Sequence, residues 1–248
     1  MTKLTGKRVW VTGGGTGIGA GAAIALAQSG AEVFVSGRRA EPLDAVVKAI
    51  TENGGVAEAM MLDVADTDSV AAAADKIGPV DILLANAGLN VPKRALRDLS
   101  VDDWNLVVDV NLNGVFYAVQ NVLPGMRDNG AGTIILISSW AGRYATRLTG
   151  AGYNATKRAV LALSETINDE EGGNGIRSTV IMPGEVATDI LKTRPVPPAD
   201  HDMARMLQVD DLAETVRFVA EMPAHVCLNE ILISPTWNRF YQGFEELG

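Results

Sequence analysis

The chain has 248 residues, of which 47% are hydrophobic and 21% are charged, a composition typical of one large globular domain with a sizeable core. The formal net charge of −9 argues against nucleic acid or an anionic membrane as the main partner, although a local basic pocket for a small anion remains compatible with it. A single cysteine excludes an intrachain disulfide, and no apolar run has the length of a membrane span or a signal-peptide core, so we expect a cytoplasmic protein.

The first predicted elements form a phosphate-binding unit. Residues 7–12 (KRVWVT) predict a buried strand and residues 20–29 a helix, with the glycine turn at residues 13–19 between them. Glycines let the backbone approach a pyrophosphate, and a helix N-terminus offers free N–H groups and a positive dipole. The spacing G-x-x-x-G-x-G differs from the more common G-x-G-x-x-G. The alternative is a turn without a ligand, but the order strand, turn, helix favours the phosphate site.

The next strand ends in two arginines. We expect this strand at residues 31–36, followed by Arg38 and Arg39. An acidic residue here would bind an adenosine ribose, whereas arginines suit a 2′-phosphate by charge and by stacking on adenine. We therefore predict NADP(H) in preference to NAD(H); the alternative is a pair of solvated arginines.

Helices and strands then alternate, with polar or small residues directly after the strands. The predicted order is helix 41–53, strand 56–62, helix 67–77 and strand 80–84. Asp63 follows the first of these strands and is expected either to reach an adenine amino group or to cap the next helix. The second is followed by Asn86, Ala87 and Gly88, whose small side chains leave room for a ribose and a nicotinamide.

A long helix is predicted to begin at Ser100, which is a favourable N-cap. Its interior contains two asparagines and a glycine at residues 111–114, which cost helix propensity and therefore suggest a packing or functional reason. The strand at 132–137 and the helix at 151–171 follow, separated by a predicted loop at 140–152.

Tyr153 and Lys157 lie one turn apart on that last helix, so their side chains share a face. A neighbouring ammonium lowers the pKa of a tyrosine from about 10, which makes the phenol a usable proton donor or acceptor. Ser139, delivered by the preceding strand, is positioned to hold a substrate carbonyl beside it.

The last third of the chain predicts a sixth strand at residues 175–182, ending in Pro183 and Gly184, and a substrate loop at about 185–208. A helix at 210–221, a strand at 230–234 and an aromatic tail at 237–248 complete the chain. Strands alternating with helices predict one α/β domain over residues 1–248, a Rossmann-like doubly wound parallel sheet with helices on both faces. Ligands then bind at the carboxyl ends of the strands.

Together these motifs resemble the short-chain dehydrogenase/reductase family, in its short single-domain branch. The matching residues are Thr12-Gly13-x-x-x-Gly17-x-Gly19, Asp63, Asn86-Ala87-Gly88, Asn111, Ser139, Tyr153-x-x-x-Lys157, Pro183-Gly184 and Thr188. The resemblance implies nicotinamide-dependent oxidoreduction of an alcohol or carbonyl by a homotetramer or homodimer. The sequence from His225 to Thr236 is similar to NADP-dependent reductases of small hydroxy acids and semialdehydes.

The resemblance also implies individual roles. Tyr153 exchanges a proton with the substrate oxygen, Lys157 lowers its pKa and binds the nicotinamide ribose, Ser139 binds the substrate oxygen, and Asn111 holds a water. Ser138 is less favoured than Ser139, which precedes the tyrosine by 14 residues where the family usually has 13. The implied cofactor-binding residues are Gly13, Thr16, Gly17, Ile18, Gly19, Arg38, Arg39, Asp63, Val64, Asn86, Ala87, Gly88, Tyr153, Lys157, Pro183, Gly184, Val186 and Thr188.

Arginines near the carbonyl site suggest the substrate. Arg143 and Arg147 lie between the serine and the tyrosine, and Arg94 follows the fourth strand. We hypothesise that Arg143 and Arg147, with Ser139 and Tyr153, bind a small anionic aldehyde or keto acid. The alternative is solvent-exposed or interface arginines.

The remaining aromatic and histidine residues have simpler interpretations. Trp140 and Tyr144 either line a pocket or pack the loop. The tail aromatics are expected at a subunit interface, the alternative being a lid on a neighbour's site; they are Trp237, Phe240, Tyr241 and Phe244. His201 and His225 have no ligand-spaced partners, so we predict no catalytic metal.

Two alternative functions remain open. A 3-oxoacyl-thioester reductase would need a basic patch for its carrier protein, which a net charge of −9 makes less attractive. A non-catalytic NADP-binding regulator usually lacks the tyrosine or the lysine, and this chain has both.

Overall fold

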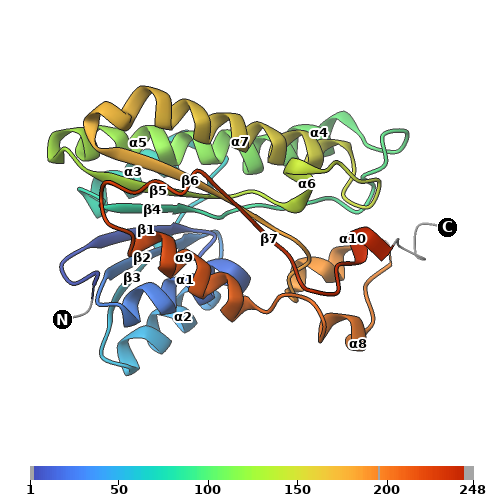
Figure 1. Ribbon diagram of the computed structural model, residues 1–248, viewed down its shortest axis with the longest axis horizontal. Helices are drawn as coiled ribbons and strands as arrows, with labels where there is room; N and C mark the ends of the chain where they lie inside the picture. Colours follow the sequence, from blue (N-terminus) through green and yellow to red (C-terminus); the bar gives the residue numbers. More distant parts are fainter. Residues whose placement is uncertain (1–2, 195, 243–248) are drawn as a thin grey trace.

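The computed structural model describes residues 3–194 and 196–242, which form a seven-stranded parallel sheet between two helical layers (Figure 1). The strand order is β3-β2-β1-β4-β5-β6-β7. The chain therefore winds outward from β1 in both directions, and the predicted Rossmann-like doubly wound fold is confirmed. The strands are β1 (Arg8–Thr12), β2 (Glu32–Gly37), β3 (Val56–Met61), β4 (Ile82–Ala85), β5 (Gly132–Ile137), β6 (Ile176–Pro183) and β7 (Glu230–Ile233).

Each face of the sheet packs against its own helices. In Figure 1, α1 (Gly17–Gln28), α2 (Ala40–Glu52) and α9 (Val209–Ala220) lie below the sheet, and α3 (Thr67–Ile77), α4 (Val101–Val108), α5 (Gly114–Asn129) and α7 (Ala151–Glu171) lie above it. Successive residues of one strand enter opposite cores, as Val9 and Val11 belong to one buried cluster and Trp10 to the other. Burial on both faces explains the continuous apolar runs of the central strands.

Helices α3 and α4 both begin at side-chain caps. The Ser100 hydroxyl accepts the Asp103 N–H at 3.1 Å, which confirms the expected start of α4. The cap of α3 is Asp66, whose carboxylate accepts from Asp68 N at 3.0 Å. The alternative that Asp63 caps this helix is therefore wrong, because the chain makes one further turn before the helix begins: Asp63 accepts from Ala65 N at 3.0 Å instead.

The long helix predicted from Ser100 is divided by a π-helical turn at Asp109–Asn113, which separates α4 from α5. A Cβ at Gly114 would lie 2.9 Å from the Val64 backbone oxygen, so the glycine allows close packing at this point. In contrast to the sequence expectation, the run Val101–Asn129 has the length and mean hydropathy (1.2) of a membrane span. Its apolar face, however, lies in the core, where Val115 and Met126 are buried.

Short elements occur in segments that we expected to be loops. They are α6 (Trp140–Arg143), a 3-10 turn at Gly172–Asn174, a second at Asp189–Thr193, α8 (Asp200–Met203) and α10 (Arg239–Gln242). A parallel bridge between Val186 and Leu207 closes the base of the substrate loop. Figure 1 shows α8 and α10 next to each other, beyond the end of β7.

An ion pair joins the two long helices of the upper layer. Arg127 on α5 donates from Nε to Oε2 of Glu171, the last residue of α7, at 2.9 Å, and Asn174 Nδ2 donates to the same oxygen at 2.9 Å. The Glu171 side chain is buried, whereas Arg127 is half exposed. The hydrogen bonds from Arg127 and then Asn174 lower the pKa of Glu171 to about 2.

We predict that Glu171→Gln destabilises the fold near neutral pH and that this deficit disappears in acid. The folded-state pKa of Glu171 lies below its unfolded value of about 4.3, so the pair stabilises the fold above that pH. Its contribution is lost as the pH falls towards 2. Thermal unfolding across this range checks the sign, with the exposed neighbour Glu170→Gln as control. A stability difference that stays constant with pH would contradict the assignment.

Candidate active site

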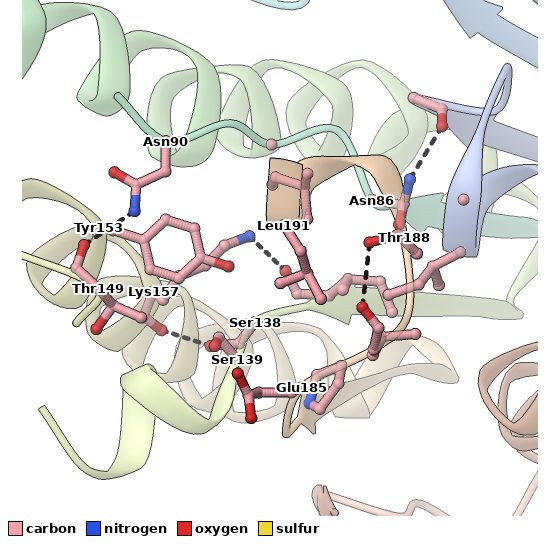
Figure 2. Close-up of a pocket in the computed structure, with 18 of the residues that line it drawn as sticks. Asn86, Asn90, Ser138, Ser139, Thr149, Tyr153, Lys157, Glu185, Thr188 and Leu191 are labelled. Atoms are coloured by element: carbon pink, nitrogen blue, oxygen red, sulfur yellow. Dashed lines mark hydrogen bonds between the residues drawn. The ribbon is translucent and has the colours of Figure 1, made fainter. Parts of the chain in front are cut away.

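Two adjoining cavities open at the carboxyl ends of the strands. The larger is about 290 Å³ and the smaller about 160 Å³, and both are lined by Gly13, Thr16, Ala87 and Gly88. The larger cavity also contacts the ends of β5 and β6, the start of α7 and the substrate loop (Figure 2). The chain adds β2 and β3 on one side of β1 and β4 to β7 on the other. Doubly wound sheets have an open crevice at this switch point, which here lies between β1 and β4.

The glycine turn brings the N-terminus of α1 to both cavities. Gly13 and Gly17 have φ of 64° and 55°, and a Cβ at Gly19 would lie 2.3 Å from the Gly13 carbonyl oxygen. Thr16 is the N-cap residue but makes no side-chain cap hydrogen bond. Thr16, Gly17 and Ile18 line the larger cavity, so the positive end of the helix dipole is available to an anion.

Asn86 braces this turn from the end of β4. Its Nδ2 donates to the carbonyl oxygens of Thr12 at 3.2 Å and Gly13 at 3.1 Å. The backbone N–H groups of Asn86 and Ala87 both donate to the Thr12 hydroxyl, at 3.1 and 3.2 Å. Asn86 therefore has a structural task in addition to its place in the cavity lining.

The residues expected at the adenosine end lie together in the smaller cavity. Arg38 and Arg39 follow β2, and Asp63 and Val64 follow β3; all four line it. Both arginine side chains are exposed. Parallel pairing of β2 with β3 sets the two strand ends side by side, which explains how residues distant in sequence share one cavity.

Ser139 and Tyr153 both line the larger cavity, and the Ser139 hydroxyl lies close enough to the phenol to lower its pKa. The Ser139 hydroxyl also accepts from Ala141 N at 3.2 Å. Ser138 has a different partner, since its hydroxyl donates to the Lys157 carbonyl oxygen at 2.7 Å (Figure 2). The geometry thus agrees with the preference for Ser139 as the serine next to the tyrosine.

Lys157 is buried with its ammonium group on the end of β5. Its Nζ donates to the Ile137 carbonyl oxygen at 2.8 Å and lies 5.7 Å from the centre of the Tyr153 ring. Burial lowers the pKa of Lys157 to about 8. The ammonium is therefore only partly protonated in weakly alkaline solution.

The expected depression of the Tyr153 pKa is not found. Although the side chain reaches the cavity surface, burial of the phenol raises its pKa above the ordinary value. The Ser139 hydrogen bond and then the charges of Arg194 and Arg94 oppose this rise without cancelling it. Sequence reasoning included the lysine charge but not the desolvation of the phenol.

Asn111 lies in the π-helical turn and is fully buried. Its Oδ1 accepts from Leu89 N at 2.8 Å, and its Nδ2 donates to Leu89 O at 2.9 Å and to the Thr156 hydroxyl at 3.4 Å. A Cβ at Gly88 would lie 3.2 Å from Lys157 Nζ and 3.4 Å from Asn111 Oδ1. Asn111 therefore holds the segment after β4 close to the lysine. The water implied by the resemblance stays a prediction.

The arginines at the site differ from those expected. Arg143 and Arg147 are exposed and lie outside the cavity lining that the described residues define; Arg143 faces Glu230 at 3.9 Å. Because α6 begins directly after Ser139, the loop coils there and does not carry Arg143 over Tyr153. Arg94 and Arg194 line the cavity instead. The position of Arg94 after the fourth strand pointed to the site, but the sequence carries no such signal for Arg194.

Arg94 is buried, and its Nε donates to the Val91 carbonyl oxygen at 2.9 Å. Burial and then the charge of Arg194 lower the pKa of Arg94. Two guanidinium groups thus act on each other and on the Tyr153 phenol from the cavity wall.

The predicted residues after β6 line the same cavity; they are Pro183, Gly184, Val186 and Thr188. Phe240 of the tail also lines it and stacks on Trp140, with ring centres 5.6 Å apart and planes at 9°. Trp140 contacts Tyr144 as well, at 5.1 Å. Phe240 therefore packs on its own chain, and the subunit interface expected for the tail aromatics stays a prediction. Phe244 lies outside the described residues.

Within residues 3–194 and 196–242, no group of three or more His, Cys, Asp or Glu residues has an arrangement that could hold a metal ion.

Comparison with known proteins adds a family to this geometry. Residues 7–197 match the family model described as short chain dehydrogenase. A 3-oxoacyl-[acyl-carrier-protein] reductase of Synechocystis is 36% identical over 231 residues, covering 90% of this chain and 93% of that protein. The glycine betaine reductase ATRR of Emericella nidulans is 35% identical over 241 residues, 94% of this chain but 19% of that longer protein. A metagenomic short-chain oxidoreductase solved with NADP is similar with a TM-score of 0.82 at 29% identity, covering 95% of this chain and 100% of that chain.

We predict that Lys157→Met removes a pH-dependent destabilisation of the fold, namely that caused by burying the Lys157 ammonium group. The folded-state pKa of about 8 lies below the unfolded value of about 10.4, so the cost of burying the ammonium is fully present below pH 8. As the pH rises through this window, the wild type should gain roughly 3 kcal/mol relative to the variant. Chemical denaturation at increasing pH measures this gain. Lys76→Met, at an exposed lysine, is the control, and an equal gain there would refute the assignment.

Proposed function

The chain belongs to the short-chain dehydrogenase family of oxidoreductases, and from that premise we propose that it transfers hydride between NADP(H) and a small anionic carbonyl or alcohol. The observation that carries the proposal is the joint position of the Ser139–Tyr153 pair, Lys157 and two arginines in one cavity that continues to the glycine turn.

The residues present fit a dinucleotide phosphate. The uncapped N-terminus of α1 and the close contacts of Gly13 and Gly19 suit a pyrophosphate. Arg38 and Arg39 would hold the 2′-phosphate, with Asp63 at the adenine. The NADP bound by the metagenomic relative supports this choice over NAD. When bound, NADP(H) supplies the hydride.

At the nicotinamide end, Lys157 and the segment after β6 would hold the ribose and the ring. The lining residues Pro183, Val186 and Thr188 lie at and after the end of β6, where they would support the ring. Positioning the hydride carbon against the substrate carbon is the main contribution of these groups.

The raised pKa of Tyr153 favours the phenol as a proton donor near neutral pH. In reduction, the phenol O–H would protonate the carbonyl oxygen while the Ser139 hydroxyl donates a hydrogen bond to that oxygen. The buried ammonium of Lys157 stabilises the phenolate that remains. Oxidation of the alcohol reverses these steps.

Arg94 and Arg194 support an anionic substrate. Both line the cavity, and their charges act on the Tyr153 phenol. A carboxylate between them would relieve the repulsion that lowers the pKa of Arg94. Such a group would anchor the substrate while the carbonyl faces Tyr153 and Ser139.

The second candidate is a 3-oxoacyl-thioester reductase, favoured by the 36% identity to the Synechocystis enzyme. A long acyl carrier arm needs an open path to the site. Phe240, which stacks on Trp140, occupies one wall of the cavity, and this arrangement suits a short substrate better. A non-catalytic regulator would not need the Ser139, Tyr153 and Lys157 arrangement.

We predict that Arg38→Ala weakens NADPH binding about 10- to 100-fold and leaves NADH binding nearly unchanged, because the 2′-phosphate loses a charge-assisted contact. Fluorescence titration of both dinucleotides gives the two dissociation constants. Arg97→Ala, at another exposed arginine, is the control. An equal loss for both dinucleotides would overturn the assignment of Arg38.

We also predict that Tyr153→Phe, made in the wild-type protein, lowers kcat at least about 100-fold without weakening NADPH binding, because phenylalanine has no proton to donate. A wild-type protein that binds NADPH but reduces neither free carbonyls nor acyl thioesters would favour the regulator.

We further predict that Arg94→Gln lowers kcat/KM for small keto acids about 10- to 100-fold and changes activity on neutral ketones little. Initial rates of NADPH oxidation over matched acid and neutral carbonyls measure the ratio. Arg147→Gln, outside the cavity, should leave it unchanged. A parallel loss on both substrate types would exclude an anion contact, and preference for acyl thioesters would favour the second candidate.

A further inference from the structure

A buried ion-pair cluster joins the tail to the substrate loop. Glu185 lies at the start of the loop and is 4% exposed. Its carboxylate accepts from Arg194 Nη1 at 2.5 Å and from Arg239 Nε and Nη2 at 2.9 and 3.0 Å. Arg239 Nη1 also donates to Asp202 Oδ2 at 3.2 Å. We name these four residues the Glu185 cluster.

The members of the Glu185 cluster depend on one another. Arg194 and Arg239 are both nearly buried, so each guanidinium group needs the carboxylate. Burial raises the pKa of Glu185, but the hydrogen bonds and charges of Arg239 and Arg194 outweigh it and keep the group ionised. Loss of Arg239 would remove the hydrogen bonds that join the tail to Glu185, and Asp202 would lose that guanidinium group. The contact of Arg205 with the Trp237 ring would remain between the loop and the tail.

The cluster also sets the position of an aromatic wall. Phe240 directly follows Arg239, lines the larger cavity and stacks on Trp140. Trp140 directly follows Ser139, and the Tyr241 ring meets it edge-on at 5.4 Å. An anchor at residue 239 therefore determines where Phe240 stands relative to the substrate serine.

We propose that Arg239 is a positioning residue that fastens the tail to the substrate loop through Glu185, and that Phe240 thereby closes the substrate end of the cavity and sets the length of substrate it accepts. The family match ends at residue 197, so Arg239 and Phe240 lie beyond it. The inference rests on the proposed function, and it assigns short, anionic carbonyls to the site.

The first test uses no substrate. Hydrogen–deuterium exchange is compared between the wild type, Arg239→Gln and Arg217→Gln, the last changing an arginine on α9 outside the cluster. Arg239→Gln should exchange faster in the substrate loop and the tail, with the sheet unchanged. Uniform acceleration over the whole chain, or none, would overturn the positioning role of Arg239.

The second test measures specificity. NADPH oxidation is followed with unbranched aldehydes that carry a terminal carboxylate and increase in length. Phe240→Ala should shift the ratio of kcat/KM for long over short members about tenfold towards the long ones. Arg239→Gln should shift it in the same direction, chiefly through a higher KM for the short members, and Arg239→Lys should restore part of it. Equal losses for every length would refute the proposal.

The two tests separate failure of this inference from failure of the proposed function. If the wild type reduces no carbonyl in the series, the proposed function fails, while the exchange data still decide whether Arg239 fastens the tail. If Arg239→Gln does not fold, Phe240→Ala, with Phe240→Leu as the milder change, decides the size limit alone. An unchanged preference for substrate length in Phe240→Ala would overturn the proposal that Phe240 sets the size limit.

Discussion

The burial of one ammonium group, that of Lys157, determines how four segments meet. At the end of β5, the Ile137 carbonyl oxygen accepts a hydrogen bond from Lys157 Nζ. The neighbouring Ser138 hydroxyl donates to the backbone carbonyl oxygen of Lys157. A Cβ at Gly142 would lie 2.6 Å from the Lys157 carbonyl oxygen, and one at Gly88 would lie 3.2 Å from Nζ. The ends of β4 and β5, α6 and α7 therefore pack around one charge. A buried ammonium is costly unless it is hydrogen-bonded, so these contacts are requirements of the fold as well as of the site.

Much of this arrangement could be predicted from the sequence, because strand ends meet at one edge of a parallel sheet. The expected helices at residues 67–77 and 151–171 and the strand at 132–137 have the bounds observed in the structure. Their apolar periodicity is a local signal. Residues directly after strands reached the cavities as expected, since the position of a strand end in the sheet also determines where the next residue lies. Ser139 and Asp63 are examples.

The errors have a common physical origin in contacts between segments distant in sequence. Gly114, at the end of the π-helical turn, packs closely against Val64. Helix propensity shows only that a glycine at this position destabilises a helix, and it does not show this contact. Arg143 was placed by its separation from Tyr153, but the coil of α6 turns it away. Arg194 and Arg239 meet Glu185 through tertiary folding alone, and no spacing rule connects them. The pKa of Tyr153 was misjudged because desolvation is a property of the packed interior.

The charges around the larger cavity explain how an acidic protein could bind the anionic substrate that we propose. The chain carries a net charge of −9, yet the cations at or behind the cavity wall outnumber the carboxylates there. The cations are Arg94, Lys157, Arg194 and Arg239, and the carboxylates are Glu185, Asp189 and Asp202. Inside the protein these charges interact more strongly than the surface charges, which water and salt screen. Burial that raises the pKa of Tyr153 also strengthens the attraction of this wall for a carboxylate. The same exclusion of water thus favours both the proposed proton donor and the proposed selection of an anionic substrate.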